Sequence, residues 1–371
     1  MKGHIRKRGN KWCFVLDVGR DEITGERIQK WFSGYDKKRD AERDMAEKIK
    51  EINDGTFIEE TDETIEEFMS NWLLNKKNKV RPGTWKSYAW LINSHLIPNI
   101  GNLKLSKLKP LHLNNLYNQK LIKVISANSI KKLHGLIKDA LNEGIGWGII
   151  SRNVASAVSP PRVKKVKFKV WNEEQLKIFL DASSHERYYL AFELAASTGM
   201  RIGEILGLRR VDIDLENAKL SVRQSYTKGI TGHDFHEPKT ASGERLIALF
   251  PHTVSLIKGH LEIQEREKEQ QAPIYQDHGL VIQTNVGTPV NPRNLSRTYY
   301  NILKKCDIPA IRFHDLRHTH ATLLLKRGVH PKIVQERLGH SSITITLDTY
   351  SHVLPGLQEA ALQNLGGSII G

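Results

Sequence analysis

The sequence predicts a multidomain α+β protein with three parts. These are a small N-terminal β-sheet with one helix, an all-α middle part, and a mixed, mainly helical third part with a small antiparallel sheet. Three observations predict this arrangement. The chain of 371 residues is too long for one typical hydrophobic core. Apolar residues alternate near the N-terminus and recur at helical spacing further along. Two prolines and a run of basic residues within 159–169 mark a boundary.

The first part, residues 1–57, is predicted to be a sheet covered by one helix. Residues 12–18 and 27–32 have the composition of strands, and a glycine-containing turn lies between them. Residues 37–52 predict a helix with one apolar stripe, which Gly55 ends. Such a sheet could lie in a DNA groove, and a small basic folding appendage is the alternative. The basic residues around it are Arg6, Lys7, Arg8, Lys11, Arg20, Arg27 and Lys30.

The second part, residues 62–160, is predicted to be entirely helical. Apolar periodicity indicates helices over 64–75, from Pro82 onward, over about 110–122 and over about 128–143. Proline fits the first turn of a helix, where its missing N–H is not needed. The aromatic residues are interpreted as core rather than as platforms for stacking bases. They are Trp72, Trp85 and Tyr88.

The third part, residues 170–371, mixes helices with short strands. Asn172 and Gln175 have the spacing of a capping box and predict the start of a helix. Residues 218–222 and 245–249 are strand-like.

Composition narrows the class of partner. The net charge is +15 and the pI is about 9.6, which favours a polyanionic partner and nucleic acid above all. A basic surface kept for solubility is the alternative. No stretch has the length of a membrane helix, and no signal peptide is recognisable, so we expect a cytoplasmic, nucleoid-associated protein. Cys13 and Cys306 predict neither a disulfide framework nor a cysteine zinc site.

The first of four motifs is residues 198–208. Gly199 is predicted to end one helix, and Arg201 then stands at the start of the next, where its guanidinium can reach a cleft. Glu204 follows on the same face and can orient Arg201. Taken alone, these residues are equally consistent with an ordinary surface ion pair.

The second motif, residues 236–245, predicts a hairpin between two strands, with Lys239 on its turn. A lysine there can deliver a proton to a leaving oxygen atom. Lysines on turns are common, so this motif gains meaning only beside the others.

The third motif is residues 313–320. On a helix, His314 and Arg317 share one face. His314 and His318 also have the spacing of a zinc-binding helix. Zinc is disfavoured, because Asp315 stands where the metalloprotease motif has a Glu and because an arginine would crowd a dication.

The fourth motif, residues 336–350, contains His340 and ends with Tyr350. Gly339 is predicted to end a helix, and Ser342 to cap the next helix, which carries Tyr350. Taken alone, Tyr350 would be interpreted as a packed or hydrogen-bonded core residue.

Together, two arginines, a lysine, two histidines and a late tyrosine, in this order, resemble the tyrosine recombinase (phage integrase) family. Within it, the chain looks like an integrase of a phage or an integrative conjugative element. The matching segments are Thr-Gly-Met-Arg-Ile-Gly-Glu, Pro-Lys-Thr before a strand, His-Asp-Leu-Arg-His and Leu-Gly-His, with Tyr350 ten residues after His340. They span 198–350, and the family's domain plan extends the resemblance over nearly the whole chain.

The resemblance implies a DNA strand transferase that needs neither a metal ion nor ATP. Its six implied catalytic residues are Arg201, Lys239, His314, Arg317, His340 and Tyr350. The arginines would grip the scissile phosphate, and the tyrosine would attack it to form a 3′-phosphotyrosine. His314 would act as acid and base, Lys239 would protonate the leaving 5′ oxygen, and His340 would hydrogen-bond the phosphate. Supporting roles would fall to Glu204, Asp315 and His318.

The resemblance also implies roles for the three parts and a set of partners. Residues 1–57 would bind arm-type DNA sites, residues 62–160 would clamp the core-type site, and residues 170–371 would form the catalytic domain. Four protomers would act on double-stranded DNA, with an excision factor and a host DNA-bending protein as accessory partners. Residues 354–365 would form a helix that docks on a neighbouring protomer, and packing within the same protomer is the alternative.

Three other functions use parts of the same pattern. A non-catalytic DNA-binding regulator is disfavoured by the complete set of six residue types. A type IB topoisomerase is disfavoured by the arm-like N-terminus and the C-terminal helix. A resolvase or invertase of the same chemistry would need no arm-type sites.

Overall fold

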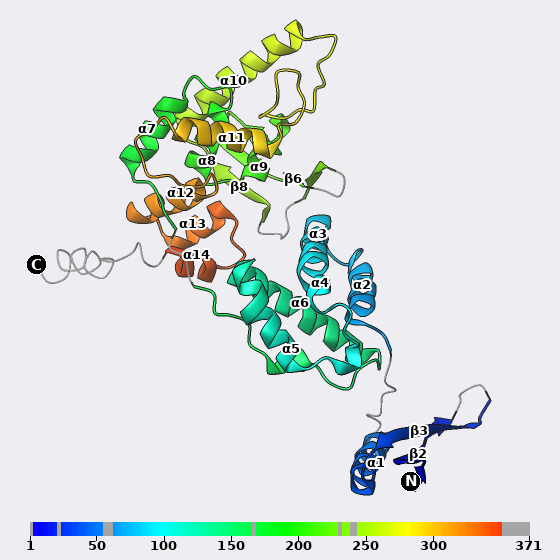
Figure 1. The fold of residues 1–371 in the computed structure, drawn as a ribbon. Helices are drawn as coiled ribbons and strands as arrows, with labels where there is room; N and C mark the ends of the chain where they lie inside the picture. Colours follow the sequence, from blue (N-terminus) through cyan, green and yellow to red (C-terminus); the bar gives the residue numbers. More distant parts are fainter. Residues whose placement is uncertain are drawn as a thin grey trace, which may run out of the picture. The chain divides into compact units, whose positions relative to one another are not determined.

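The computed structural model describes residues 3–20, 24–54, 62–164, 168–228, 232–237 and 243–350. The chain divides into two compact units, residues 1–165 and 166–371, and all four motifs belong to the second (Figure 1). The predicted fold class is confirmed, because a small sheet with a helix is followed by helices and then by a mainly helical part with small antiparallel sheets. Within the described ranges, no helix is long and apolar enough to cross a membrane.

The N-terminal part is an antiparallel sheet of order β1–β2–β3 with one helix packed on it. Its elements are β1 (His4–Arg8), β2 (Lys11–Arg20), β3 (Arg27–Tyr35) and α1 (Lys38–Asn53). Phe14, Leu16 and Ala41 form its buried core. The two predicted strands and the helix are confirmed, but β1 was not predicted. Four of its five residues are basic or histidine, so no apolar alternation marks it. Residue 23 of the predicted turn and Gly55 lie outside the described residues.

The middle part is a helical bundle around a single apolar core. Its α-helices are α2 (Ile65–Lys76), α3 (Pro82–Leu91), α4 (Ile97–Ile100), α5 (Pro110–Asn115) and α6 (Ala127–Gly146). Pro82 occupies the first turn of α3, as predicted. Trp72 is fully buried, and Trp85 and Tyr88 pack against the core, which confirms that these rings are structural.

Two of the expected helices are not regular. A π-helical turn, Ile92–Leu96, joins α3 to α4. The helix expected over 110–122 changes to a π-helical turn at Leu116–Lys120 and a 3₁₀ turn at Leu121–Lys123. Apolar spacing cannot distinguish these turns from an α-helix, because their buried side chains still reach the same core.

The third part packs helices around two small sheets of order β4–β5–β8 and β6–β7. The predicted capping box of Asn172 and Gln175 is present at the start of α7. The helices are α7 (Glu173–Ser183), α8 (Tyr189–Thr198), α9 (Ile202–Leu206), α10 (Pro251–Gln270), α11 (Pro292–Leu303), α12 (Asp315–Lys326), α13 (Pro331–Leu338) and α14 (Ile343–Tyr350). The strands are β4 (Ile213–Asp214), β5 (Lys219–Val222), β6 (Ser225–Lys228), β7 (His233–His236) and β8 (Arg245–Ala248).

The strands correct one prediction and confirm another. The strand-like residues 218–222 and 245–249 correspond to β5 and β8, which pair with each other. The hairpin expected over 236–245 is wrong, because β7 pairs with β6 while β8 pairs with β5. This segment therefore connects two sheets. Strand-like residues on both sides of a turn do not reveal which strands pair.

Candidate active site

Helix ends bring the first, third and fourth motifs together. Gly199 ends α8 and Gly339 ends α13, both in the left-handed conformation and both as predicted. Arg201 immediately precedes α9. Helix α12 packs against both α8 and α13, and α13 packs against α14. Residues more than 100 positions apart in sequence therefore meet at one place in the second unit.

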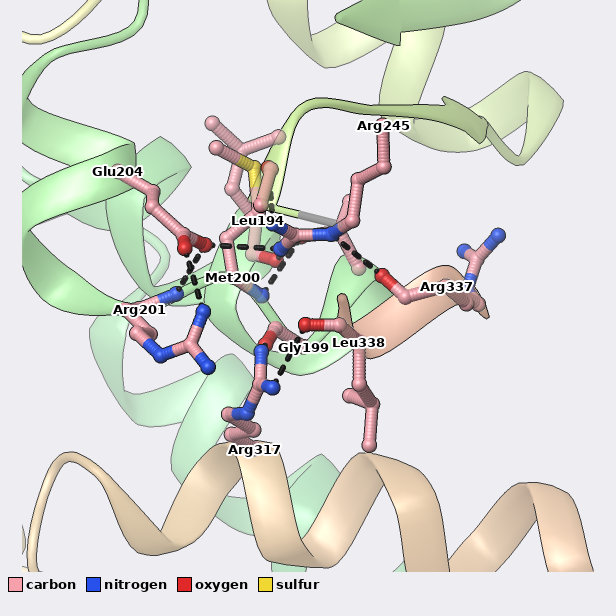
Figure 2. A network of polar contacts seen from close by, with 11 residues as sticks. Leu194, Gly199, Met200, Arg201, Glu204, Arg245, Arg317, Arg337 and Leu338 are labelled. Carbon is pink, nitrogen blue, oxygen red and sulfur yellow. Dashed lines mark hydrogen bonds and ion pairs between the residues drawn. The ribbon is translucent and has the colours of Figure 1, made fainter. Parts of the chain in front are cut away.

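Arg201 is held by a carboxylate that also binds a second arginine (Figure 2). Nη1 of Arg201 donates to Oε1 of Glu204 at 2.7 Å, and Nη2 of Arg245 donates to Oε2 at 2.8 Å. The Glu204 side chain is 7% exposed and that of Arg201 is 42% exposed. Burial raises the pKa of Glu204, but the two arginines lower it to about 2. The carboxylate is thus buried and charged, so this is not an ordinary surface ion pair.

Arg245 is itself fixed by backbone oxygens. Its Nε donates to the carbonyl of Arg337 at 2.7 Å and its Nη1 to the carbonyl of Gly243 at 3.2 Å. Figure 2 shows the Arg245 guanidinium between Glu204 and the Arg337 carbonyl. A buried chain of contacts therefore runs from β8 through Glu204 to Arg201.

Arg317 is buried and bound by two helix ends. Its Nη1 donates to the carbonyl of Gly199 at 2.8 Å and its Nη2 to the carbonyl of Leu338 at 2.6 Å (Figure 2). Carbonyls at helix C-termini lack partners within the helix, so they are available to hold the guanidinium. Burial and Arg201 lower the pKa of Arg317 to about 9, which leaves it charged near pH 7.

The hydroxyl of Tyr350 contacts a histidine. Tyr350 lies on α14, is 1% exposed and packs among apolar residues of α12 and α13. Its hydroxyl oxygen is 2.7 Å from Nδ1 of His318. Burial raises the pKa of Tyr350 to about 12, although Arg317 opposes this shift.

His318 is enclosed and neutral. The ring of Phe168 stacks on the His318 ring with centroids 4.1 Å apart. Burial and the neighbouring His314 lower the pKa of His318 to about 4. The imidazole therefore carries no charge near pH 7.

The two other predicted histidines lie near the same arginines. His314 precedes α12 as its N-cap residue, so it is not within the helix as expected. Burial, Arg317 and Arg201 lower the pKa of His314. The same causes lower the pKa of His340 to about 3, and its Nδ1 is 2.8 Å from Oγ1 of Thr346. Ser342 accepts a hydrogen bond from the backbone N of Thr344 and so caps α14 as predicted.

Four of the predicted site residues, Arg201, His314, His340 and Tyr350, thus gather around the fifth, Arg317, and Lys239 lies outside the described residues. At the centre, Arg201 and Arg245 share the buried carboxylate of Glu204, and Arg317 is bonded to two backbone carbonyls. Three guanidinium groups thus accompany one carboxylate, so the site is positively charged and suited to an anion. In the described parts of the chain, no group of three or more His, Cys, Asp or Glu side chains could hold a metal ion.

Sequence reasoning missed two residues of this site. Arg245 follows the predicted lysine turn, but its contact with Glu204, 41 residues away, has no local signal. Phe168 sits in the basic segment before the catalytic part, where nothing in the sequence marks its stacking on His318.

Sequence models of three families match the chain. The phage integrase family matches residues 169–356, the phage integrase N-terminal SAM-like domain matches residues 64–121, and an arm DNA-binding domain matches residues 4–52. A tyrosine recombinase XerC-like protein of Caldanaerobacter subterraneus subsp. tengcongensis is 30% identical over all of this chain and 99% of that protein. The ICEBs1 integrase of Bacillus subtilis is 25% identical over 95% of this chain and 96% of that protein.

Solved structures share the fold. The Tn1549 transposon integrase in complex with transposon right end DNA has a TM-score of 0.69 and 21% identity, covering 81% of this chain and 99% of that one. A lambda integrase tetramer bound to a Holliday junction has a TM-score of 0.59 and 20% identity, covering 95% of each chain. The chain therefore belongs to the phage integrase family. It is a tyrosine-type site-specific recombinase of the integrase kind.

Proposed function

We propose that the chain integrates or excises a mobile element by cleaving and rejoining double-stranded DNA through a 3′-phosphotyrosyl link to Tyr350. One observation carries the proposal. Tyr350 is buried in the same apolar cluster as Leu338, whose carbonyl accepts a hydrogen bond from Arg317 at 2.6 Å. A nucleophile next to a fixed pair of guanidinium groups is suited to attack on a phosphodiester.

The two arginines would bind the non-bridging oxygens of the scissile phosphate. Opposite charges about 4 Å apart are worth about 4 kcal/mol at an effective dielectric near 20. Guanidinium forks match phosphate oxygens in geometry as well as charge. Arg201 is partly exposed, so its guanidinium can turn toward DNA while its backbone N–H stays hydrogen-bonded to Glu204. Arg317 is already fixed by its two carbonyl acceptors.

Tyr350 would be the nucleophile. A tyrosine with a pKa near 10 is only about 0.1% ionised at pH 7, and burial raises the pKa of Tyr350 further. Its proton must therefore be removed as it attacks, while Arg317 stabilises the developing negative charge. Neutral His314 and His340, both close to the arginines, would hydrogen-bond the phosphate, and His314 would assist proton transfer at the phosphate oxygens.

Lys239 would protonate the 5′ oxygen as the P–O bond breaks. The products are then a 3′-phosphotyrosine and a free 5′ hydroxyl, and attack by a 5′ hydroxyl of a partner strand reverses the step. The energy of the phosphodiester is kept in the protein–DNA bond, so ATP is not consumed. Glu204 and Asp315 would position the arginines and the start of α12 through their ion pairs.

The same proposal assigns the three parts of the chain. Residues 1–57 would bind arm-type sites, residues 62–160 would clamp the core-type site, and residues 170–371 would carry out catalysis. Strand exchange between two duplexes requires four active sites, so we propose a homotetramer on DNA. We also propose two accessory partners, an excision factor and a host DNA-bending protein. The protein would act at the nucleoid in the cytoplasm. The net charge of +15 and the relatives' names support it.

A covalent-capture assay tests the proposal. Wild type, Tyr350→Phe and Tyr299→Phe are incubated in EDTA with duplex DNA from the element's own ends, and SDS-resistant, protease-sensitive adducts are counted. Tyr299 is a fully buried tyrosine whose hydroxyl donates to a backbone carbonyl, so it controls for the loss of a buried hydroxyl. We expect adducts with wild type and Tyr299→Phe and none with Tyr350→Phe. An adduct with Tyr350→Phe would show that another residue is the nucleophile.

A further inference from the structure

We propose that His318 is the base that takes the proton from Tyr350 during cleavage. This inference rests on the proposed function and deepens it, because the nucleophile's proton then has a named acceptor. In the part of the chain that the structure describes, His318 is the one side chain hydrogen-bonded to the Tyr350 hydroxyl.

The geometry suits proton transfer. The oxygen of Tyr350 and Nδ1 of His318 are 2.7 Å apart, within the range over which a proton moves between a hydroxyl and an imidazole. A tyrosine that donates this bond requires the lone pair of Nδ1, and the ring hydrogen is then on Nε2. His314 is less suited, because it precedes α12 as its N-cap residue and, among the described contacts, no hydrogen bond joins it to the Tyr350 hydroxyl.

The surroundings keep His318 neutral and in place. Phe168 stacks on one face of the ring, and the side chain is 9% exposed. Among the described residues, the charged and titratable groups that act on it are Tyr350, His314, Asp315, Arg317, Arg312 and His340. Burial and the nearby positive charges make the ring a weak base in the free protein. A phosphodiester bound at the arginines would add a negative charge and so raise the basicity of His318 when substrate is present.

The step balances in both directions. In cleavage, the O–H bond of Tyr350 breaks and an N–H bond forms on Nδ1, while the phenolic oxygen bonds to phosphorus. The bond from phosphorus to the 5′ oxygen breaks, and that oxygen takes a proton from Lys239. In rejoining, the attacking 5′ hydroxyl gives its proton back to Lys239 as its oxygen bonds to phosphorus. The bond from phosphorus to the Tyr350 oxygen breaks, and Tyr350 recovers its proton from the imidazolium of His318. Neither direction consumes a further reactant.

Isosteric substitutions separate a base from a hydrogen-bond acceptor. In His318→Asn, the amide oxygen can take the place of Nδ1 and accept the bond, but it cannot hold a proton near neutral pH. We expect this variant of the full-length protein to bind attachment-site DNA normally. Its single-turnover rate of adduct formation should fall about 10²- to 10³-fold, as for loss of a general base. A rate within about threefold of wild type would overturn the proposal.

A nucleophile with a more acidic phenol provides the decisive readout. Replacing Tyr350 by a difluorotyrosine lowers the need for a base, so it should restore most of the lost rate in His318→Asn. It should not restore the rate of His314→Asn, the matched control on the same helix end. Lack of restoration in His318→Asn would show that the histidine only holds the site together, which overturns the proposal.

If wild type itself forms no adduct, the proposed function fails first. If wild type forms an adduct and Tyr350→Phe does not, the proposed function stands. An unexpected result with His318→Asn then overturns only the role of His318.

Discussion

Glu204 holds two of the arginines at the centre of the site, Arg201 and Arg245. Its replacement by glutamine keeps the shape but leaves Arg245 buried without a counter-ion. Breaking a buried ion pair from one side costs about 3–5 kcal/mol. We therefore expect Glu204→Gln to lower the free energy of unfolding of the catalytic part by about that amount near pH 7. Hydrogen exchange of α9 and β8 in increasing urea measures it.

The matched control for this substitution is another buried carboxyl, Glu193. Burial raises the pKa of Glu193, although its bond to Thr253 opposes the shift, and no arginine is paired with it in the contacts described. Glu193→Gln should therefore change the free energy of unfolding by no more than about 1 kcal/mol. Equal losses in the two variants would mean that the charge of Glu204 is not what stabilises the site.

The Glu204 carboxylate also predicts how the stability of the protein depends on pH. The folded-state pKa of Glu204, about 2, lies below its ordinary value of about 4.5. Its contribution to stability is therefore complete above about pH 4.5 and is lost as the pH falls toward 2. The difference in unfolding free energy between wild type and Glu204→Gln should therefore shrink as the pH falls from about 4.5 toward 2. A constant difference over this range would contradict the lowered pKa of Glu204.

At the level of single residues, the order of the motifs in the sequence was enough to predict most residues of the site. Motifs around Arg201, Arg317 and Tyr350 identified groups that the fold brings together. The motifs of Arg201 and Tyr350 include the glycine or cap that precedes their helices. Arg317 is held by backbone carbonyls of those two motifs. The partner of Tyr350 was not predictable in the same way. His318 was expected to support the site, but its bond to Tyr350 depends on how α12, α13 and α14 pack.

Among helices and strands, local signals predicted helix ends better than strand pairing. The capping box at Asn172 and the glycines at 199 and 339 act within a few residues, so the sequence shows them directly. The false hairpin over 236–245 failed because its strands pair with partners elsewhere in the chain. Strand β1 escaped prediction because its side chains are nearly all polar and exposed.

Gly199 allows a prediction about the end of a helix. Its φ is +68°, and a Cβ there would lie 2.7 Å from Leu338 and 2.8 Å from His320. Gly199→Ala should cost about 1–2 kcal/mol for the left-handed conformation and about 1–3 kcal/mol for the clash. Gly328→Ala is the control, because Gly328 has a φ of +77° and a Cβ there would have no atom within 4 Å. Urea unfolding should therefore show a clearly larger loss for Gly199→Ala, and cleavage should slow because the Gly199 carbonyl holds Arg317.

For the molecule as a whole, a basic N-terminal sheet and a separate arginine-rich site in the second unit predict more than one class of DNA contact. The N-terminal sheet carries basic side chains along β1, and Arg6 lies over the exposed ring of Trp31 with its guanidinium 4.1 Å from the ring centroid. An integrase that uses such a sheet for arm-type sites must protect two kinds of sequence on attachment-site DNA. A resolvase or invertase needs only the core-type site.

Deletion of residues 1–57 tests this division of labour. We expect the shortened chain to form the Tyr350 adduct on core-type DNA, because all the described site residues lie in the second unit. It should lose the second class of footprint. The DNA affinity of the full chain should also fall more steeply with salt than that of the shortened chain. For each phosphate contact that the deletion removes, the slopes should differ by about 0.9 in log affinity per tenfold change in salt concentration. Footprinting and binding titrations over a salt series measure both effects. A single class of footprint that survives the deletion unchanged would favour the resolvase or invertase, since the N-terminal sheet would then make no contact of its own with the site.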